Sequence, residues 1–303
     1  MQLEDILRAG RLEDILAYAI EVNAGDINIT EEDNLFFRIG KEIKEIENTY
    51  INREQIQAIV LKLTENNAAY VDLYKPSEID GSYKMTYRNK EWFFRYNISL
   101  ATNKVHISIR KLIEAIPDFH KIQMDEPKMM EFLEDMNQIK EGLYLVVGAT
   151  GSGKSTTIVT ALDYIMKNNN IKVITLEAPI EFYFNKRNYK NTVILQREIG
   201  KDTPSFYQGL VAAMRQNPDV IFVGEIRDKQ TAEAALNASL TGHMVVATLH
   251  AKSVEKTKER MKYLLDGITN DFDFINGIVY QKLVKDPQLG VKAVRNIFLN
   301  KKM

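Results

Sequence analysis

The sequence contains no cysteine among its 303 residues. Disulfide bonds, cysteine-ligated zinc sites and thiol nucleophiles are therefore excluded. Excess charge is also missing, because 40 Lys and Arg residues are balanced by 41 Asp and Glu residues. This balance argues against a protein built mainly to coat nucleic acid, since such proteins usually carry a strongly basic face.

Long hydrophobic runs are missing as well. A membrane-spanning helix needs about 20 predominantly apolar residues, and the chain has no such run. The acidic, charge-interrupted start MQLEDILRAG is unlike a signal peptide. We therefore expect no direct membrane insertion. At 45% apolar and 27% charged residues, the composition is typical of a soluble globular chain.

From about Asp26 to Arg110 the pattern is mixed, and short strands rich in aromatic and β-branched residues surround one helical segment. This pattern predicts a small α+β domain at residues 1–115. Strands are expected at Asn34–Ile39, Tyr83–Tyr87, Glu91–Ser99 and Lys104–Ile109, and a helix at Arg53–Thr64. A charged, proline-containing stretch then predicts a linker at residues 116–130.

Residues 131–303 alternate between short apolar segments and helical patterns. This alternation predicts an α/β domain with a doubly wound sheet. Its strands are expected at Leu143–Val147, Ile171–Leu176, Thr192–Leu195, Val220–Val223 and Met244–Thr248.

Residues 148–156 read GATGSGKST, between the strand pattern LYLVV and an amphipathic helix pattern. Glycines at these spacings let the backbone wrap closely around phosphate oxygens, because a Cβ would block that approach. Lys154 is expected to reach the β- and γ-phosphates, and the Ser155 hydroxyl to hold Mg²⁺. We predict that ATP is bound by Gly148, Ala149, Thr150, Gly151, Ser152, Gly153, Lys154, Ser155 and Thr156.

Carboxylates follow two of the later strand patterns. The segment PDVIFVGEIRD ends its apolar run on Gly224 and Glu225. A carboxylate at the end of a strand next to this loop is suited to hold a metal ion or a metal-bound water. The segment ITLEAPIEF places Glu177 and Glu181 at another strand end, bent by Pro179.

Half of the four histidines lie in the decapeptide TGHMVVATLH, Thr241–His250. His243 and His250 are seven residues apart, at the two ends of a strand pattern. A single histidine is more often structural than functional. Their position downstream of a phosphate-binding loop and an acidic strand nevertheless favours a role at the nucleotide.

In this order and spacing, the motifs resemble those of the GspE/PilT family, the hexameric ATPases that power type IV pili and type II secretion. GATGSGKST resembles the Walker A motif, TLEAPIE the acidic box, VGEIRD the Walker B motif and TGH…TLH the His box. The chain resembles a PilT-like member of this family, and the resemblance extends upstream through AGDINI, FRYN and IRKL, so it covers nearly the whole chain.

The resemblance implies a RecA-like P-loop ATPase domain with a smaller PAS-like N-terminal domain, six copies of which form a ring. It implies ATP hydrolysis with Mg²⁺. Glu181 would activate the attacking water and Glu225 would hold Mg²⁺ through water, although these two roles could be exchanged. Glu177 belongs to the same acidic box.

The resemblance also assigns roles to two arginines and two histidines. Arg95 and Arg110 match N-domain arginines that reach the nucleotide, where a guanidinium stabilises the developing phosphoryl charge. His243 and His250 would couple loss of the γ-phosphate to domain rotation.

The sequence departs from the family pattern in two places. Ala178 stands where the family usually has an aspartate, which could slow turnover. The segment Gly290–Asn300 is either the late strand of the family or, through AVRNIF, a final helix after a deletion. On either interpretation, we expect the C-terminal part of a retraction motor to be incomplete.

Within this family, the short N-terminal region and the lack of cysteines for a zinc module favour a pilus retraction motor. The resemblance implies that this motor is a cytoplasmic homo-hexamer at the inner face of the cell membrane, held there by an inner-membrane platform protein. A motor of a type IVB secretion or conjugation system shares the compact two-domain layout. Ala178 leaves open a weakly hydrolysing regulatory subunit that assembles with a paralogous ATPase. A nucleic-acid partner is not expected, because no basic, aromatic strand-tracking segment is present.

Overall fold

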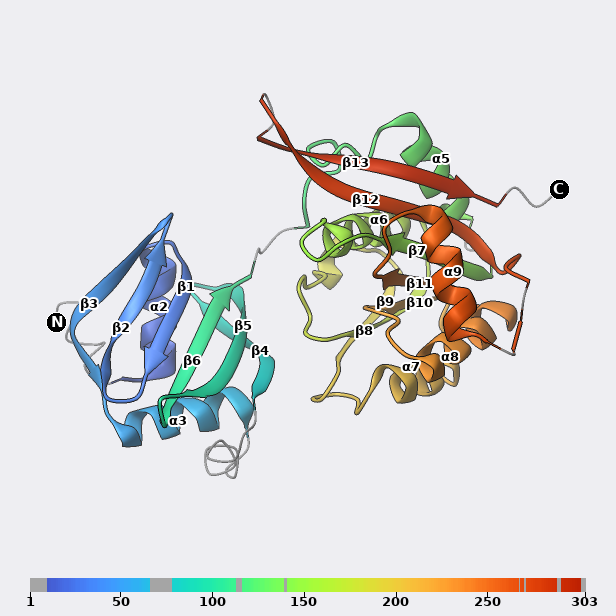
Figure 1. Cartoon of the computed structure of the whole chain (residues 1–303). Coiled ribbons are helices and arrows are strands. Elements are labelled where there is room, and N and C mark those ends of the chain that lie inside the picture. The colour runs from blue at the N-terminus through green and yellow to red at the C-terminus, as the bar shows by residue number, and fades with distance from the viewer. Residues whose placement is uncertain are drawn as a thin grey trace. The chain divides into compact units, whose positions relative to one another are not determined.

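The computed structural model describes residues 10–65, 78–112, 116–138, 141–266, 268–269, 271–287 and 290–300. The chain divides into two compact units, Met1–Glu114 and Ala115–Met303, each with its own sheet (Figure 1). Among the helices of these described ranges, none is long and apolar enough to cross a membrane.

The first unit is built on a six-stranded antiparallel sheet in the order β3-β2-β1-β6-β5-β4. Its strands are β1 (Ala24–Thr30), β2 (Asp33–Ile39), β3 (Glu42–Ile51), β4 (Ile79–Tyr87), β5 (Lys90–Ala101) and β6 (Lys104–Lys111). Two helices, α2 (Leu12–Glu21) and α3 (Arg53–Thr64), pack with the sheet in one apolar core.

Alternation along the strands gives this sheet one apolar and one polar face. Ile27 and Ile29 of β1, with Ile107 of β6, are buried in the core with the helices. The intervening residues, such as Asn28 and Ser108, lie on the opposite face, where their side chains hydrogen-bond to each other. The sheet therefore presents a polar surface on the side away from the core.

The sequence prediction of an α+β domain is confirmed, with a helix at Arg53–Thr64 and strands overlapping β2, β4, β5 and β6. Two strands were not predicted. One of them, β3, has the sequence EIKEIENTYI and is mostly exposed, so it lacks the clear alternation of apolar residues that indicates a strand.

The second unit contains a seven-stranded sheet in the order β13-β12-β7-β11-β10-β8-β9. Its strands are β7 (Gly142–Val147), β8 (Lys172–Glu177), β9 (Val193–Glu198), β10 (Val220–Val223), β11 (Met244–Leu249), β12 (Ile275–Asp286) and β13 (Gly290–Leu299). Neighbouring strands are parallel except β13, which is antiparallel to β12.

Helices cover both faces of this sheet. On one face, α5 (Pro127–Asn137) and α6 (Lys154–Asn168) pack in a core that includes Tyr144 and Val146. On the other, α7 (Phe206–Met214), α8 (Lys229–Leu240) and α9 (Val254–Leu264) pack in a core that includes Leu143 and Leu145. Successive residues of β7 therefore enter opposite cores, which confirms the prediction of a doubly wound α/β domain.

Two segments differ from the sequence interpretation. The predicted linker at residues 116–130 is too long, because residues 127–130 form the first turn of α5 and Met124 is completely buried. Pro127 starts this helix because its fixed φ suits the first helical position and its missing N–H costs no hydrogen bond there. At the C-terminus, Gly290–Leu299 is strand β13, so the strand interpretation of AVRNIF is right and the helix interpretation is wrong.

Candidate nucleotide-binding site

Four predicted motifs follow adjacent parallel strands of the second unit. The strand β7 leads into residues 148–153, its neighbour β11 leads to His250, and β10 leads to Glu225, while β8 ends on Glu177. The carboxyl ends of parallel strands lie at one edge of the sheet, which is the ligand-binding edge of open α/β folds. The sheet order therefore brings the motifs to that edge.

We call residues 148–156, which follow β7 and include the first residues of α6, the phosphate loop. A Cβ on Gly148 would lie 2.3 Å from the backbone oxygen of Gln281. Gly153 has a φ of +84° and directly precedes α6, whose free N–H groups are suited to bind an anion. Side chains are excluded at both positions, which leaves the backbone to form the cradle for phosphate oxygens.

Lys154 is the first residue of α6, and its Nζ donates to the carbonyl oxygens of Gly148 and Ala149 at 3.1 and 2.9 Å. Burial lowers the pKa of Lys154, and the charges of Glu225 and Glu181 oppose this shift. The two carboxylates therefore act electrostatically on the lysine ammonium.

His250 connects the phosphate loop to the acidic strand end. Its Nδ1 lies 3.2 Å from the carbonyl oxygen of Gly148, and its Nε2 lies 3.3 Å from Oε1 of Glu225. The other oxygen of Glu225, Oε2, lies 2.7 Å from a terminal nitrogen of Arg227. Both oxygens of the Glu225 carboxylate thus have a partner.

Glu177 and Glu181, which the sequence pairs, lie in different environments. Glu177 is buried, and its Oε1 accepts hydrogen bonds from Thr175 Oγ1 at 2.6 Å and Gln196 Nε2 at 3.2 Å. Burial raises the pKa of Glu177 to about 7. Glu181 is exposed, and its backbone amide favours the charged form of Glu177. The carboxylate of Glu177 is therefore bonded within the protein, at the start of the segment that carries Glu181.

The structure does not bring His243 to the phosphate loop. His243 precedes β11, and its Nδ1 lies 3.3 Å from the carbonyl oxygen of Ala238 near the end of α8. His250 follows β11 at its other end. A strand rises roughly 3.3 Å per residue, so the length of β11 separates the two histidines. The role of His243 at the nucleotide stays a prediction, and within this chain its side chain lies at the end of β11 that is away from the phosphate loop.

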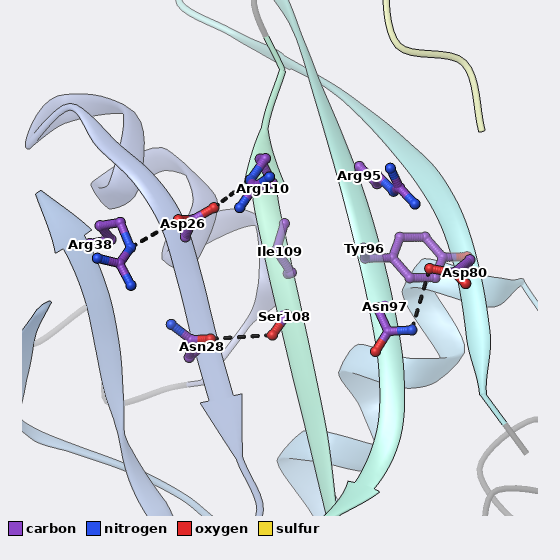
Figure 2. Close-up of a pocket in the computed structure, with 10 residues that line it drawn as sticks. All are labelled: Asp26, Asn28, Arg38, Asp80, Arg95, Tyr96, Asn97, Ser108, Ile109 and Arg110. Atoms are coloured by element: carbon purple, nitrogen blue, oxygen red, sulfur yellow. Dashed lines mark hydrogen bonds and ion pairs between the residues drawn. The ribbon is translucent and has the colours of Figure 1, made fainter. Parts of the chain in front are cut away.

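The two predicted arginines lie on the polar face of the first unit. Arg95 of β5 and Arg110 of β6 are paired in register, so both side chains emerge on one face of the sheet (Figure 2). They line a hollow of about 530 Å³. Asp26 holds Arg110 through a 2.7 Å contact to Nε and Arg38 through a 3.1 Å contact to Nε. Asp26 therefore leaves the outer ends of both guanidinium groups available for an anion.

Asp26, Arg38 and Gln281 lie outside the motifs from which site residues were predicted. Asp26 lies in the AGDINI segment, where a polar residue alternates with apolar ones and so indicates the polar face of a strand. Gln281 follows the apolar run INGIVY and is only 2% exposed. A polar residue that continues a buried strand is the signal that would have identified it.

The ligands available at the phosphate loop suit Mg²⁺. Ser155 offers a hydroxyl in the first turn of α6, and Glu225 offers a carboxylate just after β10, two strands from β7 in the sheet. Hard oxygen ligands of this kind are those that Mg²⁺ prefers, and the ion is commonly held by one or two protein groups together with substrate phosphates. Ser152 also has a buried Oγ with no hydrogen-bond partner among the described residues.

Comparison with known proteins matches residues 4–300 to the family described as "Type II/IV secretion system protein". The chain is 27% identical over 310 residues to the type IV pilus retractation ATPase PilT of Pseudomonas aeruginosa, covering 96% of this chain and 86% of that protein.

Two solved structures are similar over nearly the whole chain. The ATPase DotB of Legionella pneumophila superposes with a TM-score of 0.84 at 27% identity, covering 95% of this chain and 80% of that one. The pilus retraction motor PilT with bound ADP gives a TM-score of 0.81 at 32% identity, covering 96% and 84%.

The family match, the structural similarity and the motif order agree along nearly the whole chain. They confirm a RecA-like fold for the second unit, preceded by an N-terminal α+β domain. The chain belongs to the type II/IV secretion system protein family and is a P-loop ATPase of the GspE/PilT type.

Proposed function

We propose that this chain forms a hexameric motor that couples ATP hydrolysis to the retraction of type IV pili. The observation that carries the proposal is the convergence of Lys154, His250 and Glu225 at the phosphate loop. Retraction in particular is supported by similarity to proteins named as a pilus retraction ATPase and a pilus retraction motor. The motor would work in the cytoplasm, on an inner-membrane platform protein.

In this proposal the phosphate loop holds the phosphates of ATP. Lys154 exchanges its carbonyl partners on Gly148 and Ala149 for the β- and γ-phosphate oxygens. Ser155 and, through water, Glu225 would hold Mg²⁺. When bound, the ion neutralises the charge that develops on the transferred phosphoryl group.

The geometry favours Glu181 over Glu225 as the base that takes the proton from the attacking water. Both oxygens of Glu225 are engaged, one by Arg227 and one by His250. Glu181 is exposed, and no hydrogen bond or ion pair to its carboxylate is present within the described ranges. A base must be free to meet a water and then receive its proton.

His250 is suited to respond to the state of the γ-phosphate. It shares the carbonyl oxygen of Gly148 with Lys154. When the Lys154 ammonium moves to the phosphates, it leaves the Gly148 carbonyl oxygen, and His250 is then the one of these two side chains that still contacts it. The imidazole of His250 is free to shift, and its contact with Glu225 changes with it. When the γ-phosphate leaves, Lys154 returns. The occupancy of the loop is thus communicated to β10 and β11.

Arg95 and Arg110 would supply positive charge to the phosphates during turnover. An arginine acting on the transferred phosphoryl group is worth on the order of 10³–10⁵ in rate. Their common face on the first unit's sheet supports a joint role, because one anion could contact both guanidinium groups.

A second candidate function is a regulatory subunit that binds nucleotide but hydrolyses it slowly beside an active paralogue. Ala178 favours it, since this exposed residue follows directly on β8 and supplies no carboxylate beside Glu181. A motor of a type IVB secretion system would use the same site. Such a motor would differ from a pilus retraction motor in the assembly on which it acts, not in its nucleotide site.

Imaging of pili tests the retraction proposal directly. The gene would be deleted in the source organism and replaced by the wild-type sequence or by Lys154→Ala, and labelled pili would be followed by fluorescence microscopy. We expect pili to assemble but not retract in the deletion and in Lys154→Ala. Normal retraction in both strains would contradict the proposal. Loss of protein export with normal retraction would assign the chain to secretion.

A further inference from the structure

A buried glutamine outside the recognised motifs holds the phosphate loop. Gln281 of β12 is 2% exposed, and its Nε2 donates to the carbonyl oxygen of Ser152 at 2.6 Å. Its Oε1 accepts from the Thr157 hydroxyl at 2.7 Å. One side chain therefore fixes both the last turn of the loop and the first turns of α6.

An arginine on the neighbouring strand completes the bonding of this glutamine. Arg295 of β13 is paired in register with Gln281, and its Nε donates to Gln281 Oε1 at 2.9 Å. The remaining nitrogens of Arg295 donate to the main-chain carbonyls of Gln123 at 2.9 Å and Ile122 at 2.8 Å. The guanidinium of Arg295 thus bonds to Gln281 through Nε and to the backbone of residues 122–123 through its two terminal nitrogens.

Residues 116–126, which we call the entry segment, begin the described part of the second unit and lead into α5. Met124 of this segment is fully buried among residues of α5 and α6. Phe119 stacks on Tyr164 of α6 with ring centroids 5.6 Å apart. The entry segment is therefore docked by apolar contacts as well as by Arg295.

We propose that Arg295 and Gln281 form a polar bridge through which docking of the entry segment and nucleotide affinity at the phosphate loop control each other. The bridge runs from the carbonyls of Ile122 and Gln123 through Arg295 and Gln281 to Ser152. This inference rests on the proposed binding of nucleotide at the phosphate loop. Both residues are positioning residues, since each acts on the loop through its backbone or through another side chain.

The hydrogen bonds of the bridge explain why the loss of one partner affects the others. Hydrogen bonds from a guanidinium are stronger than neutral ones, and the three that Arg295 donates are partly buried, so their loss leaves partly buried acceptors without this donor. If the entry segment withdraws, Arg295 loses two acceptors and Gln281 loses its fixed orientation. Coupling of this kind is reciprocal, so a nucleotide that orders the loop must also favour docking of the entry segment.

The test uses the full-length chain and ADP with Mg²⁺ as the ligand, so that no turnover intervenes. Arg295→Met retains much of the side-chain bulk but removes every donor. Lys292→Met on the same strand also removes a cation, but its register partner is Val284, on the face opposite Gln281. Affinity would be measured by titration calorimetry, and amide exchange would be followed by mass spectrometry in residues 116–126 and 148–157.

We expect Arg295→Met to raise the Kd for ADP by about 5- to 50-fold, a usual range for coupling between sites, and Lys292→Met to change it less than about twofold. In the wild type, ADP should slow amide exchange in both peptides. In Arg295→Met, saturating ADP should slow exchange only in residues 148–157. Equal ADP affinity, with unchanged protection of residues 116–126, would overturn the bridge.

Two further variants protect the test against misfolding. Arg295→Lys retains the charge and should recover part of the affinity. Gln281→Glu keeps the acceptor for Thr157 and Arg295 but removes the donor to Ser152, and should weaken ADP binding without adding to the effect of Arg295→Met. Fully additive losses would contradict a shared bridge. Failure of the wild-type chain to bind ADP would instead contradict the proposed function.

Discussion

The imidazole of His250 lies between the carboxylate of Glu225, 3.3 Å from Nε2, and the Gly148 carbonyl oxygen, 3.2 Å from Nδ1. Two strand ends and the phosphate loop are thus joined through one side chain. Lys154 donates to the same Gly148 carbonyl. If Lys154 leaves this carbonyl for another partner, we expect the hydrogen bonding of His250 to change and, through His250, that of Glu225.

Replacement of His250 should slow turnover far more than replacement of His243. We expect His250→Gln to lower kcat by about 10- to 100-fold, since a hydrogen bond to a charged group is worth roughly 1.5–3 kcal/mol. His243→Gln is the matched control, because His243 contacts Ala238 at the opposite end of β11. Steady-state ATP hydrolysis by the two variants decides the matter. An equal loss of kcat in both variants would contradict the prediction that His250, and not His243, acts at the phosphate loop.

The arginines of the first unit should be needed for hydrolysis but not for ADP binding. We expect Arg95→Ala or Arg110→Ala to lower kcat by about 10³-fold or more, as for loss of an arginine that acts on the transferred phosphoryl group. Arg88→Ala is the control, since this exposed arginine pairs with Glu21 at 2.9 Å. ATP hydrolysis and ADP affinity would be measured side by side. Full activity of both arginine variants would show that this hollow serves another ligand.

Asp26 should tune the same activity less strongly. It is shared by Arg110 and Arg38, so Asp26→Asn removes the charge that orients both guanidinium groups. We expect a loss in kcat of about 10-fold, corresponding to roughly 1.4 kcal/mol of orientation energy. The same hydrolysis assay measures it, with thermal unfolding as a check on the fold. An increase in kcat would contradict this expectation, because it would mean that Asp26 holds the arginines away from the phosphates.

Glu177 should make the stability of the second unit fall as pH rises. Its pKa is raised by burial to about 7 from an ordinary value of 4.5, so between these values the folded chain binds more protons than the unfolded chain. The contribution of this group to the free energy of unfolding therefore falls as pH rises across this window, and above the window it stays at its lowered value. Glu177→Gln removes the ionisable carboxyl, so no charge is buried at this position at high pH.

Urea unfolding at pH 5, 6, 7 and 8 measures this effect. We expect Glu177→Gln to gain stability relative to the wild type as pH rises, by roughly 1–3 kcal/mol at pH 8, given 1.4 kcal/mol per pKa unit. A difference between the two proteins that stays constant from pH 5 to 8 would contradict a buried carboxyl with a raised pKa.

Much of the fold could be predicted from local pattern. The helix Arg53–Thr64 is bounded by Asn52, whose side chain caps it through the amide of Gln55, and the apolar runs at Leu143–Val147 and Val220–Val223 are buried on both faces. Local pattern failed where strands are exposed or carry polar residues. The strand β12 was not predicted, because it changes from the apolar INGIVY to the polar QKLVKD part of the way along.

The candidate site was predictable to the level of motifs but not of side-chain environments. The order of the strands was needed to show that only the end of β11 that leads to His250 lies beside the phosphate loop. The sequence pairs Glu177 with Glu181, and only tertiary packing shows that the first is buried and the second exposed. Arg295 and Gln281 could not be linked to the loop from sequence, since their partners are more than a hundred residues away.

We propose above all that the phosphate loop and Glu181 make this chain an ATP-hydrolysing ring. The most direct measurement is steady-state ATP turnover by the purified full-length chain, with its oligomer mass determined by light scattering. Lys154→Ala and Glu181→Gln are the test variants, and Lys167→Ala is the control, because Lys167 lies on α6 but pairs with Asp163 at its far end. We predict turnover from a hexamer, lost in both test variants and kept in Lys167→Ala. A folded wild-type chain that binds ATP without hydrolysing it, or turnover that survives Lys154→Ala, would contradict the claim.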